Sequence, residues 1–384
     1  MNGTIHRRKS LLAVTAFLGL FMAGASLYGQ QTFSATVYFD YKYFLSKDGP
    51  VTLKPTSPST AYLSNAFLFR RAYFNYENKI SDNLKFRFRL DADNTANVTG
   101  VSLTGTPVTG TSLSKDDKLR PFIKHLFLEY SNFLIPKMVL NVGMIETLTF
   151  KPSEDRWGLR SVAKTFVDGY KDITKKEIYA TSADIGATLK YSFNKYFRMA
   201  AGYYNGGGYG HPENDQYKEI ELQGQITPIP GLSVVGYYDY ERRLPVASLP
   251  AETKPKGQTF KVDAYLEMVK NLVLGGEWIT YKNDLYQTGG DKYDVGGYSV
   301  FGRYTIEADK FALFARYDDY MPNSLDRDQD MSLIIAGFDW APYHKSWRLQ
   351  PNVWFYNYAN RARYNAGATK NSDIVFNLTF FLSF

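Results

Sequence analysis

The sequence has no cysteine and, beyond its first residues, no long apolar run. None of its 384 residues is cysteine, which excludes disulfides and lipoprotein anchoring. After residue 29 no stretch approaches the roughly 18 uninterrupted apolar residues of a membrane-spanning helix. Any crossing of a membrane must therefore be made by strands.

Histidine and an excess of one charge are also scarce. The 45 basic residues are dispersed among 38 acidic ones, which argues against a nucleic-acid partner. Only four histidines occur, and His125 is the only one expected on a strand. No hydroxyl and acid arrangement is visible beside it, so we predict that the protein is not an enzyme. A barrel hydrolase is kept as an alternative.

The N-terminus has the pattern of a secretory signal peptide over residues 1–29. A basic segment at Arg7–Lys9 precedes an apolar run from Leu11 to Phe21 and small residues around Ala23–Ala25. Removal of this segment takes away three positive charges and lowers the formal net charge from +7 to +4. Residues 30–384 are then expected to form one domain.

Aromatic residues are abundant and make up 16% of the chain, with 31 tyrosines. Tyrosine and tryptophan gather where a protein surface crosses the boundary between lipid and water. From Ile374 to Phe384 apolar residues occupy each second position, and Phe381 is a misfit among the residues between them. This alternation predicts a strand with one lipid-facing side, and Phe384 resembles the signal that the outer-membrane assembly machinery recognises.

The same alternation predicts sixteen strands. An even number allows both ends of a barrel to lie on one side of the membrane. The expected strands are 33–45, 66–79, 84–93, 121–132, 137–147, 183–193, 196–206, 217–227, 232–241, 258–269, 272–282, 296–306, 310–320, 331–341, 348–358 and 373–384.

Short and long connections alternate strictly between these strands. The short ones are typical of periplasmic turns and the long ones of extracellular loops. The fold class that follows is all-β, a transmembrane antiparallel up-and-down β-barrel of sixteen strands. The short connections are 80–83, 133–136, 194–195, 228–231, 270–271, 307–309 and 342–347, and the long ones are 46–65, 94–120, 148–182, 207–216, 242–257, 283–295, 321–330 and 359–372.

Several strands separate apolar from charged residues. In 84–91 the charges of Lys85, Arg87 and Arg89 must face the interior, because charge on the lipid side costs several kcal/mol near the bilayer centre. A charged interior needs water, and sixteen strands leave an aqueous bore. The alternative is that Arg87 and Arg89 pair with lumen acids and brace the wall.

The longest loop, 148–182, is a candidate constriction. We predict a helix over 154–166 with Ser153 as its N-cap, which places Arg156, Arg160 and Lys164 on one face. If the loop folds into the barrel, these cations meet Arg71 and the basic row across the water and favour anions. The alternative is an external loop with a solvated basic face.

The chain resembles the bacterial outer-membrane porins, and more specifically the phosphate-selective porin O and P family. The resemblance is carried by the hairpin from Phe69-Arg70-Arg71-Ala72-Tyr73-Phe74 through Ile80-Ser81-Asp82-Asn83-Leu84 to Phe86-Arg87, by the Gly143-containing strand and by Phe384. It implies a homotrimer and passive, anion-leaning uptake of small solutes, with Arg71, Arg87 and Arg89 lining the pore. Lumen acids nearly match the bases in number, which favours a general diffusion pore.

The remaining expectations concern partners. The sequence predicts no cofactor and no metal, because the acidic segment 326–330 lacks the glycine and glutamate of a calcium loop. The expected partners are outer-membrane lipid and lipopolysaccharide, small anions and hydrophilic solutes, and the assembly machinery that would bind the last strand. An adhesive or structural role of the long loops is a further alternative.

Overall fold

The structure is a computed structural model, and it describes residues 30–45, 65–93, 97–104, 110–116, 120–169, 181–210, 213, 215–242, 256–283, 293–363 and 370–384. The predicted signal segment 1–29 lies outside the described residues. Parts of the predicted long loops 46–65, 94–120, 148–182, 207–216, 242–257, 283–295 and 359–372 also lie outside them.

Sixteen antiparallel strands close into a barrel, which confirms the predicted fold class and strand number. Each strand pairs with its neighbours along the barrel, and β1 pairs with β18 to complete the ring. The barrel strands are β1 (Gln30–Phe44), β2 (Asn65–Lys79), β3 (Leu84–Asp93), β6 (Arg120–Ser131), β7 (Met138–Glu146), β8 (Ala183–Ser192), β9 (Phe197–Tyr204), β10 (Glu219–Ile229), β11 (Leu232–Arg242), β12 (Lys256–Leu266), β13 (Leu272–Asn283), β14 (Tyr293–Glu307), β15 (Phe311–Met321), β16 (Met331–Trp340), β17 (Trp347–Tyr358) and β18 (Ser372–Ser383).

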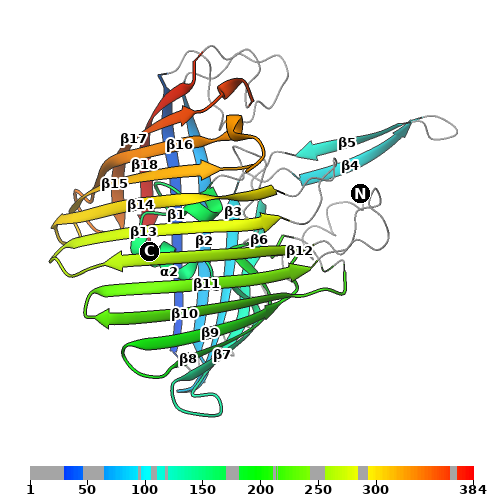
Figure 1. The fold of residues 1–384 in the computed structure, drawn as a ribbon, viewed down its shortest axis with the longest axis vertical. Coiled ribbons are helices and arrows are strands. Elements are labelled where there is room, and N and C mark those ends of the chain that lie inside the picture. Colours follow the sequence, from blue (N-terminus) through cyan, green and yellow to red (C-terminus); the bar gives the residue numbers. More distant parts are fainter. Residues whose placement is uncertain are drawn as a thin grey trace, which may run out of the picture.

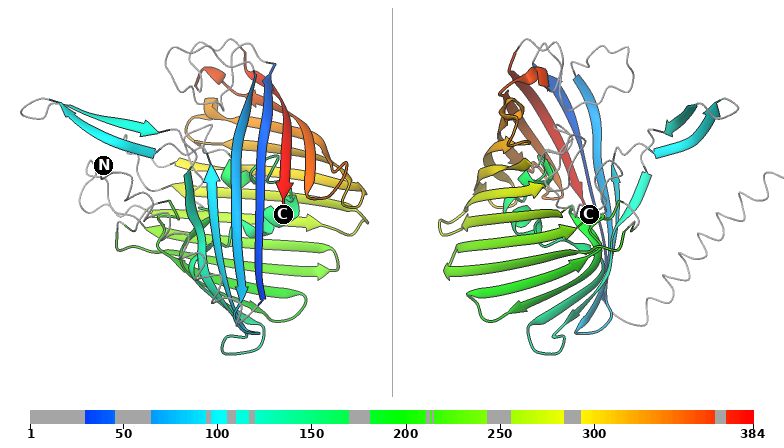
Figure 2. Two further views of the ribbon diagram at one scale, coloured as in Figure 1. Left: turned by 180° about the vertical axis from the view of Figure 1, so that it is seen from behind. Right: turned by 45° about the vertical axis from the view of Figure 1, so that its right-hand side comes forward.

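Opposite walls of the barrel cross each other (Figures 1 and 2). Strands β9 to β13 run across the direction of β1, β2 and β3, which lie behind them in Figure 1. This crossing is the consequence of strand tilt, which closure of a sheet into a barrel requires.

One pair of strands lies outside the barrel. The segment 94–120, predicted as a long connection between barrel strands, contains the two-stranded hairpin of β4 (Asn97–Thr104) and β5 (Gly110–Asp116). Figure 1 and the right-hand view of Figure 2 show this hairpin extending away from the barrel wall. No strands were predicted within this connection.

The wall carries charged side chains on its inner face and apolar ones on its outer face. On β12, Phe260 and Val262 are exposed on the outer surface, whereas Lys261 and Asp263 are 1% and 2% exposed on the inner one. On β15, Leu313 is exposed outside. An apolar outside and a polar inside are the pattern of a barrel that lies in lipid.

The helical segments of the described residues are few and short. They are α2 (Lys151–Trp157), α3 (Phe166–Gly169), η2 (Arg327–Gln329) and η3 (Arg361–Arg363). Among the described residues, none of the helices has the length and apolar character needed to span a membrane.

The C-terminal strand has the predicted alternation. Asn377 and Thr379 are buried on the inner side, and Thr379 donates a hydrogen bond to Asp40 of β1 at 2.6 Å. Phe381 has the same parity, so this exception to the pattern faces the lumen. Phe384 is 80% exposed, and its backbone exchanges two hydrogen bonds with Ala35.

Candidate functional site

The segment 147–169, called the inner loop below, lies inside the barrel and is anchored first on β10 and β13. The Leu148 amide donates to a carboxylate oxygen of Glu221 at 2.8 Å. The Ser153 hydroxyl donates to Glu277 at 2.9 Å and accepts from Lys261 Nζ at 2.6 Å. Because these partners face the lumen, this part of the inner loop lies against the inner side of the wall.

The predicted single helix over 154–166 is wrong. Helix α2 begins at Lys151 with Pro152 in its first turn, where proline's fixed φ is favourable, and its N-cap is Phe150 rather than Ser153. It ends at Trp157, and its C-cap Gly158 has a φ of 64°, in the left-handed region. Helix α3 begins only at Phe166. Arg156, Arg160 and Lys164 therefore do not share a helical face.

Aromatic packing fixes the middle of the inner loop. The Trp157 ring lies 5.4 Å from that of Phe301 and 6.0 Å from that of Phe314, in edge-to-face geometry. Phe166 packs in the same way on Tyr320. These residues belong to the largest buried apolar cluster of the described chain. The lumen faces of β12 to β17 with the inner loop on them are called the packed side below.

Beyond α2 the inner loop reaches β17 and β2 and then returns. Ser161 donates a hydrogen bond to Gln350 at 2.7 Å, and Arg70 donates to the carbonyl of Val162 at 3.1 Å. Arg316 of β15 then binds the carbonyl of Lys164. The inner loop thus follows much of the barrel's circumference.

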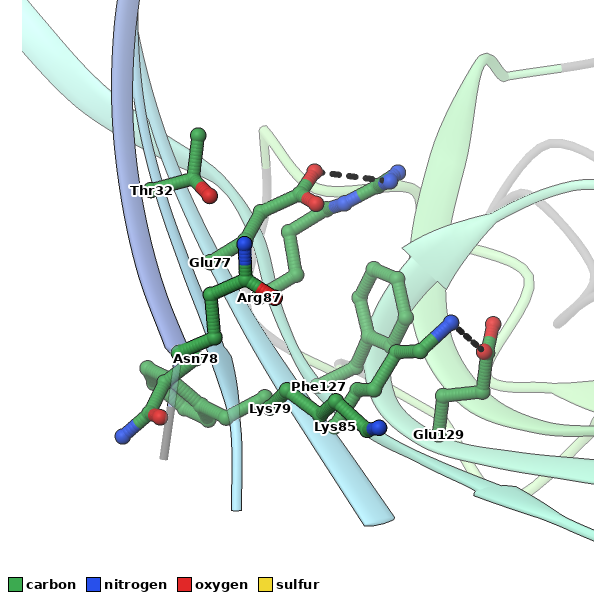
Figure 3. A pocket seen from close by; sticks show the side chains of 10 residues that line it. Thr32, Glu77, Asn78, Lys79, Lys85, Arg87, Phe127 and Glu129 are labelled. Carbon is green, nitrogen blue, oxygen red and sulfur yellow. Dashed lines mark ion pairs between the residues drawn. The ribbon is translucent and has the colours of Figure 1, made fainter. Parts of the chain in front are cut away.

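The lumen faces of β3 and β6, with the ends of β1, β2 and β7 beside them, are called the open side below. Here the predicted basic row remains accessible to solvent: the Lys85 side chain is 55% exposed and that of Arg87 31% exposed. Figure 3 shows both in a recess of about 280 Å³, together with Glu77, Phe127 and Glu129.

Each base of the row has a partner on the wall. Arg87 pairs with Glu77 at 2.8 Å, and Lys85 pairs with Glu129 at 3.4 Å. Arg89 donates to the side-chain oxygen of Asn75 at 2.5 Å. The ion pairs of Lys85 and Arg87 are partly exposed and contribute only about 0–1 kcal/mol each to stability. Because both side chains remain in contact with water, their charges are available to ions in the lumen.

Further along the same wall a second basic group is buried. Arg71 pairs with Asp91 at 3.3 Å and with Asp93 at 2.9 Å. Lys124 of β6 pairs with the other oxygen of Asp91 at 3.4 Å. Arg71 therefore lies on the lumen side as predicted, but its charge is held among carboxylates.

Two β-bulges explain the lumen residues that sequence reasoning missed. The pairing of β1 with β2 shifts by one residue at Tyr38 and Phe39, so both Arg70 and Arg71 face inward. The pairing of β3 with β6 shifts beside Arg89, so Lys124 and His125 share the inner face. A step of three in the outward apolar residues marks the second bulge in the sequence, from Ile123 to Leu126, Leu128 and Tyr130.

The three cations of the inner loop have different surroundings. Arg156 lies 3.6 Å from Glu267 and over the ring of Tyr265. Arg160 pairs with Glu154 at 3.0 Å and Asp168 at 2.9 Å, and its side chain is 11% exposed. Lys164 lies 3.7 Å from Asp168 and is 35% exposed.

The acid between two of these cations is strongly perturbed. Burial alone would raise the pKa of Asp168. The positive charges of Lys164 and Arg160 outweigh burial and hold the pKa of Asp168 well below its usual range. Asp168 therefore keeps its negative charge, and its ion pairs, in all but strongly acidic solution.

His125 is 1% exposed, and its nearest acid is Glu146, at 3.9 Å from Nδ1. Neither ring nitrogen forms a hydrogen bond within the described part of the chain. A nucleophile must lie within hydrogen-bond reach of its base. The same described residues contain no cluster of histidine and carboxylate groups suited to a metal ion.

No protein-family model and no curated protein matches the sequence. Solved structures do match. The outer membrane channel DcaP of Acinetobacter baumannii aligns over 93% of this chain and 98% of its own, with 12% identity and a TM-score of 0.57. The anion-selective porin from Comamonas acidovorans aligns over 93% and 100%, with 12% identity and a TM-score of 0.57. OmpT of Vibrio cholerae, expressed in the outer membrane, aligns over 93% and 98%, with 15% identity and a TM-score of 0.55.

The chain therefore has the barrel fold of bacterial outer-membrane porins and channels. Together with the apolar outer surface, this confirms the prediction of an outer-membrane β-barrel. Identities this low establish the fold alone.

Proposed function

We propose that the protein is an outer-membrane porin, a water-filled channel for passive diffusion of small hydrophilic solutes and ions with a mild preference for anions. One observation carries the proposal: the row of Lys85, Arg87 and Arg89 lies on the solvent-accessible side of a lumen whose other side is packed. Fixed cations along a narrow aqueous path favour anions.

The preference is mild because the same wall carries acids. Glu77 and Glu129 pair with two of the three bases and reduce the net field that a permeating ion meets. A phosphate preference is the finer form of the proposal, with Arg71, Arg87 and Arg89 as the anion-binding residues. It rests on the sequence resemblance to the phosphate-selective porins.

The inner loop is proposed as the constriction. Of its cations, Lys164 and Arg156 retain the greater solvent exposure, and we expect them to act on passing ions. Arg160 pairs with Glu154 and Asp168. We expect it to stabilise the conformation of the inner loop and also to contribute to the loop's charge.

The first test is single-channel conductance of the refolded protein in a planar bilayer, with a salt gradient to give the reversal potential. Arg87→Gln should shift the potential toward cation selectivity and leave the barrel folded. The matched control is Lys345→Gln, which removes the same charge from the connection after β16. Equal potentials for all three proteins would contradict the anion-selective row.

A second measurement distinguishes the effect of the inner-loop cations on selectivity from that of the basic row on the wall. Reversing the charge of Arg156 and Lys164 together should shift the reversal potential further than Arg87→Gln does, because both lie on the segment that narrows the bore. An unchanged reversal potential would contradict the inner loop as the constriction, while the proposal of a channel would stand.

An adhesive role is the second candidate, and the β4–β5 hairpin favours it because the hairpin extends away from the wall (Figure 2). Deleting 97–116 should leave conductance intact and abolish binding to a partner if adhesion is the function. That the protein is not an enzyme stays a prediction, checked by assaying lipid and peptide hydrolysis.

The proposed partners follow from the same reading. They are outer-membrane lipid and lipopolysaccharide around the barrel, a homotrimer of barrels, and assembly machinery that binds the last strand through Phe384. Deleting Phe384 should lower the amount of assembled barrel in cells, whereas normal membrane levels would count against the signal.

A further inference from the structure

Tyr73 of β2 lies where the inner loop meets the wall. Its hydroxyl oxygen accepts two hydrogen bonds from guanidinium groups, one from Arg71 Nη1 at 3.0 Å and one from Arg160 Nε at 3.2 Å. The side chain is buried, with an exposed fraction of 9%. Both donors are permanently charged, so each bond is strengthened if the oxygen is negative.

Cations also surround the ring. The guanidinium of Arg89 lies 5.1 Å from the ring centroid, the Lys124 ammonium 5.5 Å and the Arg71 guanidinium 5.6 Å. They come from β3, β6 and β2, and Arg160 adds a fourth from the inner loop. A buried phenol is thus enclosed by positive charge from four segments.

The Tyr73 hydroxyl can form only a limited set of hydrogen bonds with the cations around it. A phenol has one proton to donate, and its oxygen can accept hydrogen bonds in the remaining directions. Here the two guanidinium groups occupy those directions. Within the described part of the chain, no oxygen accepts a hydrogen bond from the Tyr73 hydroxyl. As a neutral phenol the group would direct its own proton toward cations.

Acids and bases both lie near Tyr73. Five carboxylates lie at this junction, and each is paired with a base. Six bases lie around them. The carboxylates are Asp40, Asp91, Asp93, Glu154 and Asp168, and the bases are Arg70, Arg71, Arg89, Lys124, Arg160 and Lys164.

We propose that Tyr73 is a phenolate at neutral pH and that this fixed negative charge, set among the cations of the junction, limits the anion preference of the channel. The ionisation of Tyr73 is inferred from the hydrogen bonds and charges alone, whereas its effect on selectivity rests on the proposed function. Asp91 of β3 opposes the ionisation, but it is paired with both Arg71 and Lys124.

Tyr38 of β1 provides an internal comparison. Its ring lies 6.3 Å from that of Tyr73, the residue is also buried, and the guanidinium of Arg70 lies over the ring. Within the described residues, no guanidinium donates a hydrogen bond to the Tyr38 hydroxyl. We therefore expect Tyr38 to remain a neutral phenol.

The test is near-ultraviolet absorption, because a phenolate absorbs where a phenol does not. At about pH 8, below the ordinary tyrosine pKa of about 10, the folded protein should show the absorbance of one phenolate per chain. Tyr73→Phe should lose it and Tyr38→Phe should keep it. Arg160→Gln, which removes one donor, should move the transition to higher pH. Equal spectra for the wild-type protein and Tyr73→Phe would overturn the proposal.

Reversal potentials test the role in selectivity. At neutral pH Tyr73→Phe should be more anion-selective than the wild-type protein, and the difference should vanish at low pH, where the phenol is protonated. A phenolate signal with equal potentials for both proteins would overturn the role in selectivity alone. A folded barrel that conducts no ions would contradict the proposed function, while the absorbance would still decide the ionisation.

Discussion

The packed side and the open side of the lumen use the same strand pattern but hold their charges differently. On the packed side, Lys261 is 1% exposed and is enclosed by Asp263, Glu277 and the Ser153 hydroxyl. On the open side, Lys85 meets Glu129 with more than half of its side chain in water. A charged side chain that points inward is therefore not always a pore residue. Its role depends on whether other side chains bury it or water reaches it.

The sharpest way to break this comparison is to remove one lysine from each side. Lys261→Ala leaves two buried carboxylates without their cation and should lower the free energy of unfolding by about 3–5 kcal/mol. Lys85→Ala breaks an exposed pair and should cost about 0–1 kcal/mol. Denaturant unfolding followed by tryptophan fluorescence checks both values, and similar losses would contradict the distinction between the sides.

A smaller effect is expected where α2 ends on the packed side. Gly158 has a φ of +64°, and an added Cβ would lie 2.3 Å from a guanidinium nitrogen of Arg303. A non-glycine residue in this conformation costs about 1–3 kcal/mol. Gly158→Ala should therefore loosen the inner loop, measured as faster proteolysis within 147–169. Gly207→Ala is the control, since its added Cβ meets nothing within 4 Å, and equal cleavage rates would refute the strain.

The smallest effect concerns pH. The folded-state pKa of Asp168 lies below the ordinary value of about 3.9, so its pairing with Arg160 stabilises the inner loop above that pH and is lost as the pH falls through the folded-state pKa. At neutral pH the Asp168→Asn variant should have a lower free energy of unfolding than the wild-type protein in denaturant unfolding. This difference should disappear only in strong acid. Asp82→Asn, in an exposed turn, should show almost no gap. A gap that closes near neutral pH would exclude this assignment.

Strand pattern was readable from the sequence because the two sides of each strand face media as different as lipid and water. The predicted strand 84–93 coincides with β3, and most other predicted bounds differ from the structure by one to three residues. The basic row on β3 follows from the same argument, since no alternative orientation keeps Lys85, Arg87 and Arg89 out of lipid.

The rest depends on interactions that alternation does not encode. A bulge adds one residue and reverses the parity beyond it, which is why Arg70 and Lys124 were not assigned to the lumen. The path of the inner loop is set by distant partners, such as Gln350 for Ser161, and Pro152 and Gly158 determine where α2 begins and ends. Regular periodicity predicted one longer helix and missed both limits.

The seam between β1 and β18 has a consequence for how the molecule forms. The Asp40 and Thr379 side chains that bond across it are 339 residues apart in the chain, and the final backbone bonds join Ala35 to Phe384. Contacts between such distant segments require the closure of a long loop, which costs conformational entropy before the contacts can stabilise the fold. Such contacts slow folding. Until this last ladder forms, two unpaired strand edges remain exposed, so we expect closure of the seam to be the slow and vulnerable step of folding.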